Sequence, residues 1–164
     1  MGVFRMTKDQ IQDYTLRITE ANRSQLVVIM YEVILDCVND AVSSHKDNDM
    51  EQYTKQLKKA QSFLNELMGG LDYQYEISFE LMQLYIYVNK VLIEAMMKKD
   101  PGYLGSAKSV INKLLFAFKE VAKQDNSESL MKNTQKVYAG LTYGRKNLDE
   151  SCLATNVSSR GFMA

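Results

Sequence analysis

Apolar residues recur along most of the chain at the three- and four-residue spacing that places them on one face of an α-helix. This spacing predicts five helical segments, at about residues 8–18, 22–44, 49–69, 78–99 and 101–124. The last four are long and joined by short connections, which make neighbouring helices antiparallel. The pattern therefore predicts an all-α fold, an up-and-down antiparallel bundle of four long helices with the short N-terminal helix packed against it.

Residues at the segment ends agree with these boundaries. Thr7, Asn22 and Asp49 stand where N-caps are expected, each with a glutamine three residues later. This spacing predicts a capping box, in which cap and glutamine satisfy each other's backbone amides. The Gly69-Gly70 pair is expected to end the third of the five segments, because glycine accepts the left-handed conformation found at many helix ends.

After residue 124 the helical spacing of apolar residues is no longer sustained. We therefore predict a bundle domain at residues 1–125 and a tail at residues 126–164 that is partly helical or extended. The tail carries scattered apolar residues, among them Tyr138, Leu141 and Phe162, that can dock in a groove. This suggests that the tail folds back over a binding groove, in which case truncation after Gln124 should tighten partner binding.

Charge and cysteine content indicate which classes of partner and which compartment to expect. Lys+Arg and Asp+Glu balance at 20 each, so no net field favours nucleic acid or an anionic membrane. No apolar run is long enough to span a bilayer, and the N-terminus lacks the apolar stretch of a secretory signal. Cys37 and Cys152 are expected to be free thiols in a reducing compartment, and we expect a cytosolic protein.

The residues that enzymes and metal sites require do not form a recognisable pattern. His45 is the single histidine, no Glu-x-x-His pair is present, and the two cysteines lack zinc-ligand spacing. A histidine phosphotransfer bundle is disfavoured because His45 falls at a helix end with no glycine after it. We expect no catalytic residue, no cofactor and no metal. Ten methionines and ten tyrosines instead favour a protein that binds a partner.

Three stretches together resemble the flagellin-secretion chaperone family, FliS. The first stretch, at residues 84–100, reads LYIYVNKVLIEAMMKKD and is similar to the family's Leu-Tyr-x-Tyr element with its closing acidic residue. The second stretch, at residues 60–78, reads AQSFLNELMGGLDYQYEIS and resembles the family's segment that joins the third helix to the fourth. The third stretch runs from an Ile-x-x-Tyr element, Ile11 and Tyr14, to the apolar LVVIMYE. The resemblance covers about residues 8–124.

Some positions depart from the family pattern. Asn22 caps the second helix without the family's proline, and Ile86 and Val91 are apolar where polar residues are usual. Phe118 replaces a frequent tryptophan. These departures concern the shape of the binding surface.

The resemblance implies a cytosolic chaperone that binds the C-terminal segment of flagellin, prevents its premature polymerisation and delivers it to the flagellar type III export gate. It also implicates Ile11 and Tyr14 in docking on the gate, although the pair can equally pin the short helix to the bundle.

The second and fourth helices carry more apolar positions than one face can bury, and we expect the flagellin groove there. The candidate contacts are Val27, Met30, Tyr31, Ile34, Tyr85, Ile86 and Val88. Each of them can also be ordinary core. The same apolar strips allow self-association, so the alternative is a self-assembling helical module, a homodimer included, without a flagellin client.

Overall fold

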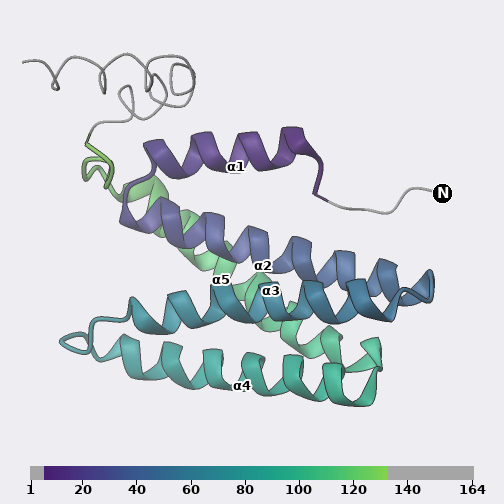
Figure 1. Ribbon diagram of the computed structural model, residues 1–164. Helices are drawn as coiled ribbons and strands as arrows, with labels where there is room; N and C mark the ends of the chain where they lie inside the picture. The colour runs from purple at the N-terminus through teal and green to yellow at the C-terminus, as the bar shows by residue number, and fades with distance from the viewer. Residues whose placement is uncertain (1–5, 133–164) are drawn as a thin grey trace, which may run out of the picture. The chain divides into compact units, whose positions relative to one another are not determined.

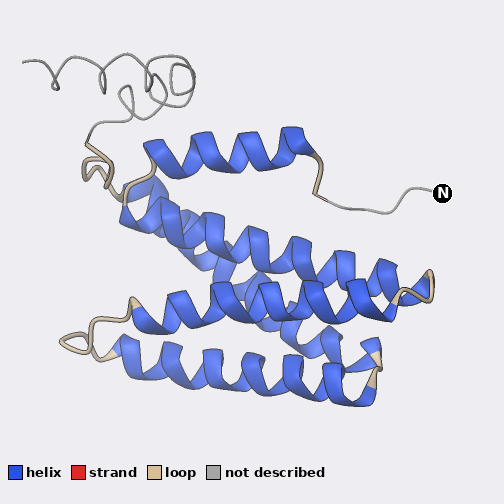
Figure 2. Cartoon of the chain, viewed as in Figure 1, coloured by secondary structure: helices blue, strands red, loops and turns tan. Residues whose placement is uncertain are grey.

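The computed structural model describes residues 6–132, and helices are the only regular secondary structure in that range. The elements in order are α1 (Lys8–Glu20), α2 (Arg23–Lys46), α3 (Met50–Gly69), α4 (Ile77–Lys98), a 3-10 turn η1 (Pro101–Tyr103) and α5 (Leu104–Gln124) (Figures 1 and 2). The prediction of an all-helical protein is confirmed for this part of the chain. Much of the predicted tail lies outside the described residues.

The helix starts follow the capping residues. Thr7 and Asn22 each form the predicted capping box with the glutamine three residues later. At α3 only half of the box forms, because Asp49 accepts from the Gln52 amide at 2.9 Å while the Gln52 side chain is buried. Asn22 therefore caps α2 with its side chain and fixes where the helix begins.

The helix ends differ from the expectation. Gly70, the C-cap of α3, has a φ of −86° and is right-handed, so the predicted left-handed glycine is wrong. The left-handed C-cap is instead Lys99, with a φ of 52°, at the end of α4. Its carbonyl oxygen accepts a hydrogen bond from His45 Nε2 at 3.0 Å, which ties the end of α4 to the end of α2.

The four long helices pack around one core. α2 contacts α3 and α5, α4 contacts the same two helices, and α1 contacts α2. Figure 1 shows α2, α3 and α4 side by side in alternating directions, with α5 crossing behind them. This places the start of α2, the end of α3 and the start of α4 at one end of the core, where the candidate site is found.

Three of the largest fully buried side chains are tyrosines, Tyr31, Tyr53 and Tyr85. Buried phenols need hydrogen-bond partners. The hydroxyls of Tyr31 and Tyr85 pair with each other at 2.5 Å, and the Tyr53 hydroxyl donates to the Ala95 carbonyl oxygen at 2.9 Å. The core thus joins α2 to α4 and α3 to α4 by specific polar contacts within an apolar interior.

The α4 helix is apolar on its outer face as well as its buried one. Its exposed apolar residues include Phe79, Ile86, Ile93 and Met97. The sequence indicated that this helix carries more apolar positions than one face can bury, and in this structure its outer face is open. No helix in the described range has the length and apolar character needed to cross a membrane.

Candidate partner-binding groove

A cavity of about 440 Å³ opens at the surface where α2 begins, α3 ends and α4 begins. Its apolar lining comes from four helices, the α3–α4 connection and the segment after α5. The apolar lining residues are Leu26, Val27, Met30, Leu67, Leu71, Tyr75, Leu81, Tyr85, Phe118 and Leu130. A concave apolar surface with a polar edge is the usual form of a binding site.

The floor of the groove belongs to the core. Leu67, Leu81 and Tyr85 are all buried, so their positions are fixed by packing on every other side. Val27 and Met30 on α2 are half-buried and form a wall. The groove is therefore a rigid floor with a partly exposed wall that a partner can cover.

The α3–α4 connection is shaped by Asp72. Its side chain accepts from the Gln74 amide at 3.0 Å, and its carbonyl oxygen accepts from Ser78 Oγ at 2.6 Å. Such side-chain turns fix a loop without regular structure. They hold Leu71 and Tyr75 at the edge of the groove.

Phe118 forms the α5 side of the groove. Its ring meets the Tyr31 ring edge-on, with centroids 5.5 Å apart, and Tyr31 in turn contacts Tyr85. Phe118 thus closes the groove over the buried tyrosine pair. Burial is the main cause that raises the pKa of both tyrosines, so both hydroxyls stay neutral.

Three of the seven residues predicted to contact a partner meet in this groove. Val27, Met30 and Tyr85 line it, although Tyr85 is 1% exposed and presents only its edge. Their helical spacing was the signal that identified them.

The other four lie elsewhere. Tyr31, Ile34 and Val88 are inside the core with no exposed surface, so a partner can reach them only if the helices separate. Ile86 is 55% exposed on the outer face of α4, away from the groove lining. Periodicity identifies an apolar face but does not tell which of its residues stay open.

Several groove residues were not singled out from the sequence. Leu71 and Leu130 lie in connections without a helical period, and no periodic signal can find them. Leu81 follows the apolar stripe of its helix, but a stripe alone assigns it to the core. Phe118, which lines the groove, was noted from the sequence only as a departure that concerns the shape of the binding surface.

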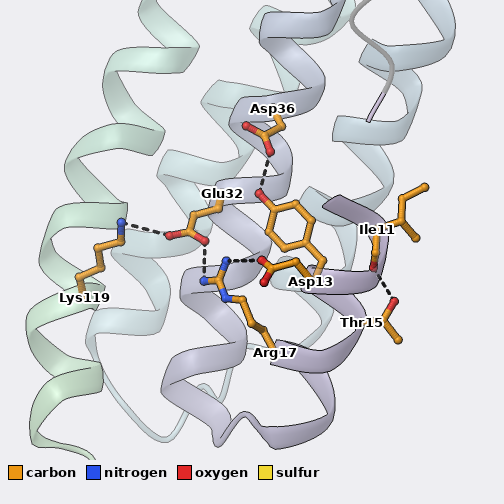
Figure 3. A network of polar contacts seen from close by, with 8 residues as sticks. Ile11, Asp13, Thr15, Arg17, Glu32, Asp36 and Lys119 are labelled. Carbon is orange, nitrogen blue, oxygen red and sulfur yellow. Dashed lines mark hydrogen bonds and ion pairs between the residues drawn. The ribbon is translucent and has the colours of Figure 1, made fainter. Parts of the chain in front are cut away.

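The two residues of the N-terminal Ile-x-x-Tyr element, Ile11 and Tyr14, lie in different surroundings. Tyr14 donates a hydrogen bond to Asp36 Oδ2 on α2 at 2.7 Å, and burial with the neighbouring Asp36 carboxylate raises its pKa. Ile11 is 50% exposed, and Figure 3 shows it directed away from α2. Tyr14 therefore pins α1 to α2, whereas Ile11 is left open. No residue of α1 lines the groove.

A chain of charges joins three helices beside Tyr14. Arg17 donates to Glu32 Oε2 at 2.6 Å, and Lys119 Nζ lies 3.1 Å from Glu32 Oε1 (Figure 3). Arg17 also lies 3.9 Å from Asp13. Glu32 on α2 thus bridges α1 and α5, which fixes how α1 lies.

No cluster of metal-ligating side chains occurs among residues 6–132. Cys37 is buried, and desolvation raises the pKa of its thiol to about 11, so it is not a nucleophile. His45 is held by Lys99 and lies edge-on to the Tyr53 ring. Both side chains thus hold the fold in place, whereas the apolar groove offers a surface that a partner can cover.

Comparison with known proteins agrees with the resemblance drawn from the sequence. Residues 6–125 match the model of the family described as flagellar protein FliS. The chain belongs to the FliS family. It is similar to the flagellar secretion chaperone FliS of Bacillus subtilis (strain 168), with 24% identity over 111 residues, which are 68% of this chain and 84% of that protein. The FliS match ends at residue 125, one residue after the end of α5.

Proposed function

We propose that this protein is a cytosolic chaperone for flagellin, that it holds the C-terminal segment of flagellin and that it delivers the client to the flagellar export gate. Membership of the FliS family and the chaperone name of the Bacillus subtilis relative support this role. In this proposal the four long helices act as an up-and-down bundle that frames the groove. Binding and release are the whole mechanism, and no bond is made or broken.

The observation that carries the proposal is the open apolar groove between α2, α3, α4 and α5. Before assembly, flagellin's terminal helices lack the subunits they pair with and expose apolar faces. An amphipathic helix can lay such a face in a groove, with apolar residues one turn apart filling successive positions. Val27 and Met30, which lie nearly one turn apart on α2, offer a matching wall.

Magnitudes show how much of the client must be covered. A sub-micromolar complex requires a net gain of more than about 8 kcal/mol. Each large apolar side chain that becomes fully buried contributes roughly 1.5–3 kcal/mol, and ordering a client segment costs about 2–5 kcal/mol or more. The client must therefore bury several side chains, which requires the length of the groove and not a single contact.

The direct test is calorimetric titration of the chain with the C-terminal segment of flagellin from the same organism. We expect sub-micromolar one-to-one binding, a negative heat-capacity change from apolar burial and a gain of helix in circular dichroism. A flagellin segment from the middle of the client is the matched control and should not bind. Absence of binding by the C-terminal segment at high micromolar concentration would refute the proposal.

Delivery to the gate is assigned to α1. Ile11 is exposed and makes no contact that α1 needs for its position, so Ile11→Asp should weaken capture by the gate's cytoplasmic domain while flagellin binding is unchanged. The expected loss is about tenfold, the amount that removal of one buried large apolar side chain gives. Gln12→Asp, at an exposed neighbouring position, is the control and should keep capture intact. Equal capture by the Ile11 variant would assign the gate contact elsewhere.

A specific observation favours the second candidate, self-association. The outer face of α4 exposes Phe79, Ile86, Ile93 and Met97, and an open apolar face of this kind usually meets a partner. Sedimentation of the chain at rising concentration tests it. A homodimer that Ile86→Lys abolishes would support this function, and a monomer throughout would exclude it.

A further inference from the structure

The chain does not leave the helices when α5 ends. Beyond Gln124 it turns back onto the start of α2, where Asn22 Nδ2 donates to the Asp125 carbonyl oxygen at 3.0 Å and to that of Ser127 at 3.4 Å. The Leu130 amide then donates to the Ala21 carbonyl oxygen at 3.0 Å. The residues Asp125–Leu130, here called the strap, thus run across the junction of α1 and α2.

The first residue of the strap is anchored by its side chain. Ser24 Oγ donates to Asp125 Oδ2 at 2.5 Å, and the Ser127 amide donates to Asp125 Oδ1 at 3.0 Å. These hydrogen bonds, with the one from Ser127 the largest cause, lower the pKa of Asp125 to about 2. The carboxylate is therefore ionised at neutral pH and its acceptor bonds persist.

Leu130, the last residue of the strap, lies in the groove. Leu130 is one of the lining residues, together with Leu26 and Val27 of α2. It is 54% exposed, so it covers part of the groove without being enclosed by it. Only a few backbone and side-chain hydrogen bonds of the strap keep Leu130 at the apolar wall. An apolar side chain of a client that is buried more completely can therefore replace it.

Most of the strap lies beyond the region that matches the family model. The FliS match ends at residue 125, whereas the strap continues to Leu130. Its anchor Asp125 and its partners Asn22 and Ser24 lie within the match, and Asn22 occupies the cap position that opens α2.

We propose that the strap is a built-in occupant of the groove, which must move away before a client helix can fill it. The inference rests on the proposed chaperone function. A helix that covers Leu26 and Val27 needs the space in which Leu130 lies. Only molecules whose strap is released can bind fully, so the apparent affinity is lowered by the released fraction. The strap keeps the apolar groove partly covered while no client is present.

The test uses the full chain with single substitutions in the strap. Asp125→Ala removes the anchor and does not touch the groove, and Leu130→Ser removes the occupant. Each should tighten binding of the C-terminal flagellin segment by roughly tenfold or more, which corresponds to the loss of one hydrogen bond to a charged group or of one apolar contact. Glu128→Ala, at an exposed position of the same segment, is the matched control and should leave the affinity unchanged.

Hydrogen exchange gives a second readout. The Leu130 amide should be protected in the free protein by its bond to Ala21 and should lose this protection when the client binds. If the original chain binds the flagellin segment and both variants bind it with the same affinity, the strap proposal alone is overturned. It is also overturned if Leu130→Ser binds more weakly and the Leu130 amide stays protected when the client binds. Failure of the original chain and of every variant to bind overturns the proposed function itself, and the strap with it.

Discussion

The pair of tyrosines below the groove shows how single residues decide the packing of this protein. Tyr31 and Tyr85 are both buried, and each satisfies the other's hydroxyl group. Removing one hydroxyl leaves the other without a partner in an apolar surrounding, which costs more than the net gain of the hydrogen bond. The two residues therefore act as a unit.

We expect Tyr85→Phe and Tyr31→Phe each to lower the free energy of unfolding by about 1–3 kcal/mol, because each leaves one buried hydroxyl unsatisfied. The double variant should lose clearly less than the sum of the two, because no orphan hydroxyl remains. Urea unfolding of the four proteins measures this. Additive losses would mean that the two hydroxyls do not depend on each other.

Asp40 is a second residue at which the structure predicts a measurable effect. It is 8% exposed on α2, and its Oδ2 has no hydrogen-bond partner within the described residues. Burial first, and then the nearby Asp36, raises the pKa of Asp40, while Lys59 opposes the rise. A raised pKa means that folding favours the protonated carboxyl group, so the stability from this residue is present at low pH and is lost as pH rises through the raised value.

Asp40→Asn should therefore raise the melting temperature at neutral pH, because asparagine stays uncharged. The gain should shrink as pH falls and vanish below 3.8, the ordinary pKa of the carboxyl group, because Asp40 is then itself neutral in both states. Thermal unfolding of the two proteins across this pH range tests it. A difference independent of pH would show that the charge of Asp40 is not its cause.

At the scale of elements, α1 is the helix with the fewest supports. Tyr14 and Ile18 pack against the core, and Leu16 and Ile11 remain exposed. The Tyr14–Asp36 hydrogen bond and the partly buried Arg17–Glu32 ion pair join α1 to α2. α1 is thus held to α2 by few groups, which suits a helix that we propose contacts the export gate.

We expect the double variant Tyr14→Phe with Arg17→Ala to speed hydrogen exchange throughout α1, because both anchors to α2 are lost. Global stability should fall by only about 1–2 kcal/mol, and exchange in α2 and α3 should change little. The pair Lys123→Ala and Glu120→Ala, which breaks an exposed ion pair within α5, is the control. Uniformly faster exchange in all helices would contradict a separately held α1.

The elements also show what the sequence can and cannot predict. Thr7 and Asn22 identified their helix starts because capping depends on local residue chemistry. The left-handed Lys99 could not be predicted, because it is tied by a residue 54 positions away, His45. Likewise Val27 and Met30 carried a helical period, whereas Leu130 reaches the groove through a bond to Ala21 that no pattern encodes.

The whole molecule offers three separate surfaces for partners. We propose that the groove at the start of α2 takes flagellin, that exposed Ile11 on α1 meets the gate, and that the outer face of α4 is the candidate for self-association. The α1 helix contacts α2 without lining the groove. A chaperone that keeps its client while it docks needs this separation, because the two contacts must be made at once.

The separation predicts that client and gate bind independently. The gate's cytoplasmic domain should be captured with the same affinity, within about twofold, by the free chain and by the chain saturated with the C-terminal flagellin segment. Calorimetric titrations of both forms measure this. A large difference in either direction would show that the two surfaces are coupled.

The central claim is that the groove holds the flagellin helix, and two matched valine variants test it most directly. Val27→Lys places a charge on the groove wall, whereas Val121→Lys places the same charge at a 51% exposed position of α5 that does not line the groove. With both variants shown to be folded by circular dichroism, we expect at least a tenfold loss of affinity for the C-terminal flagellin segment with Val27→Lys and no loss with Val121→Lys. Equal affinity of the two variants would contradict it.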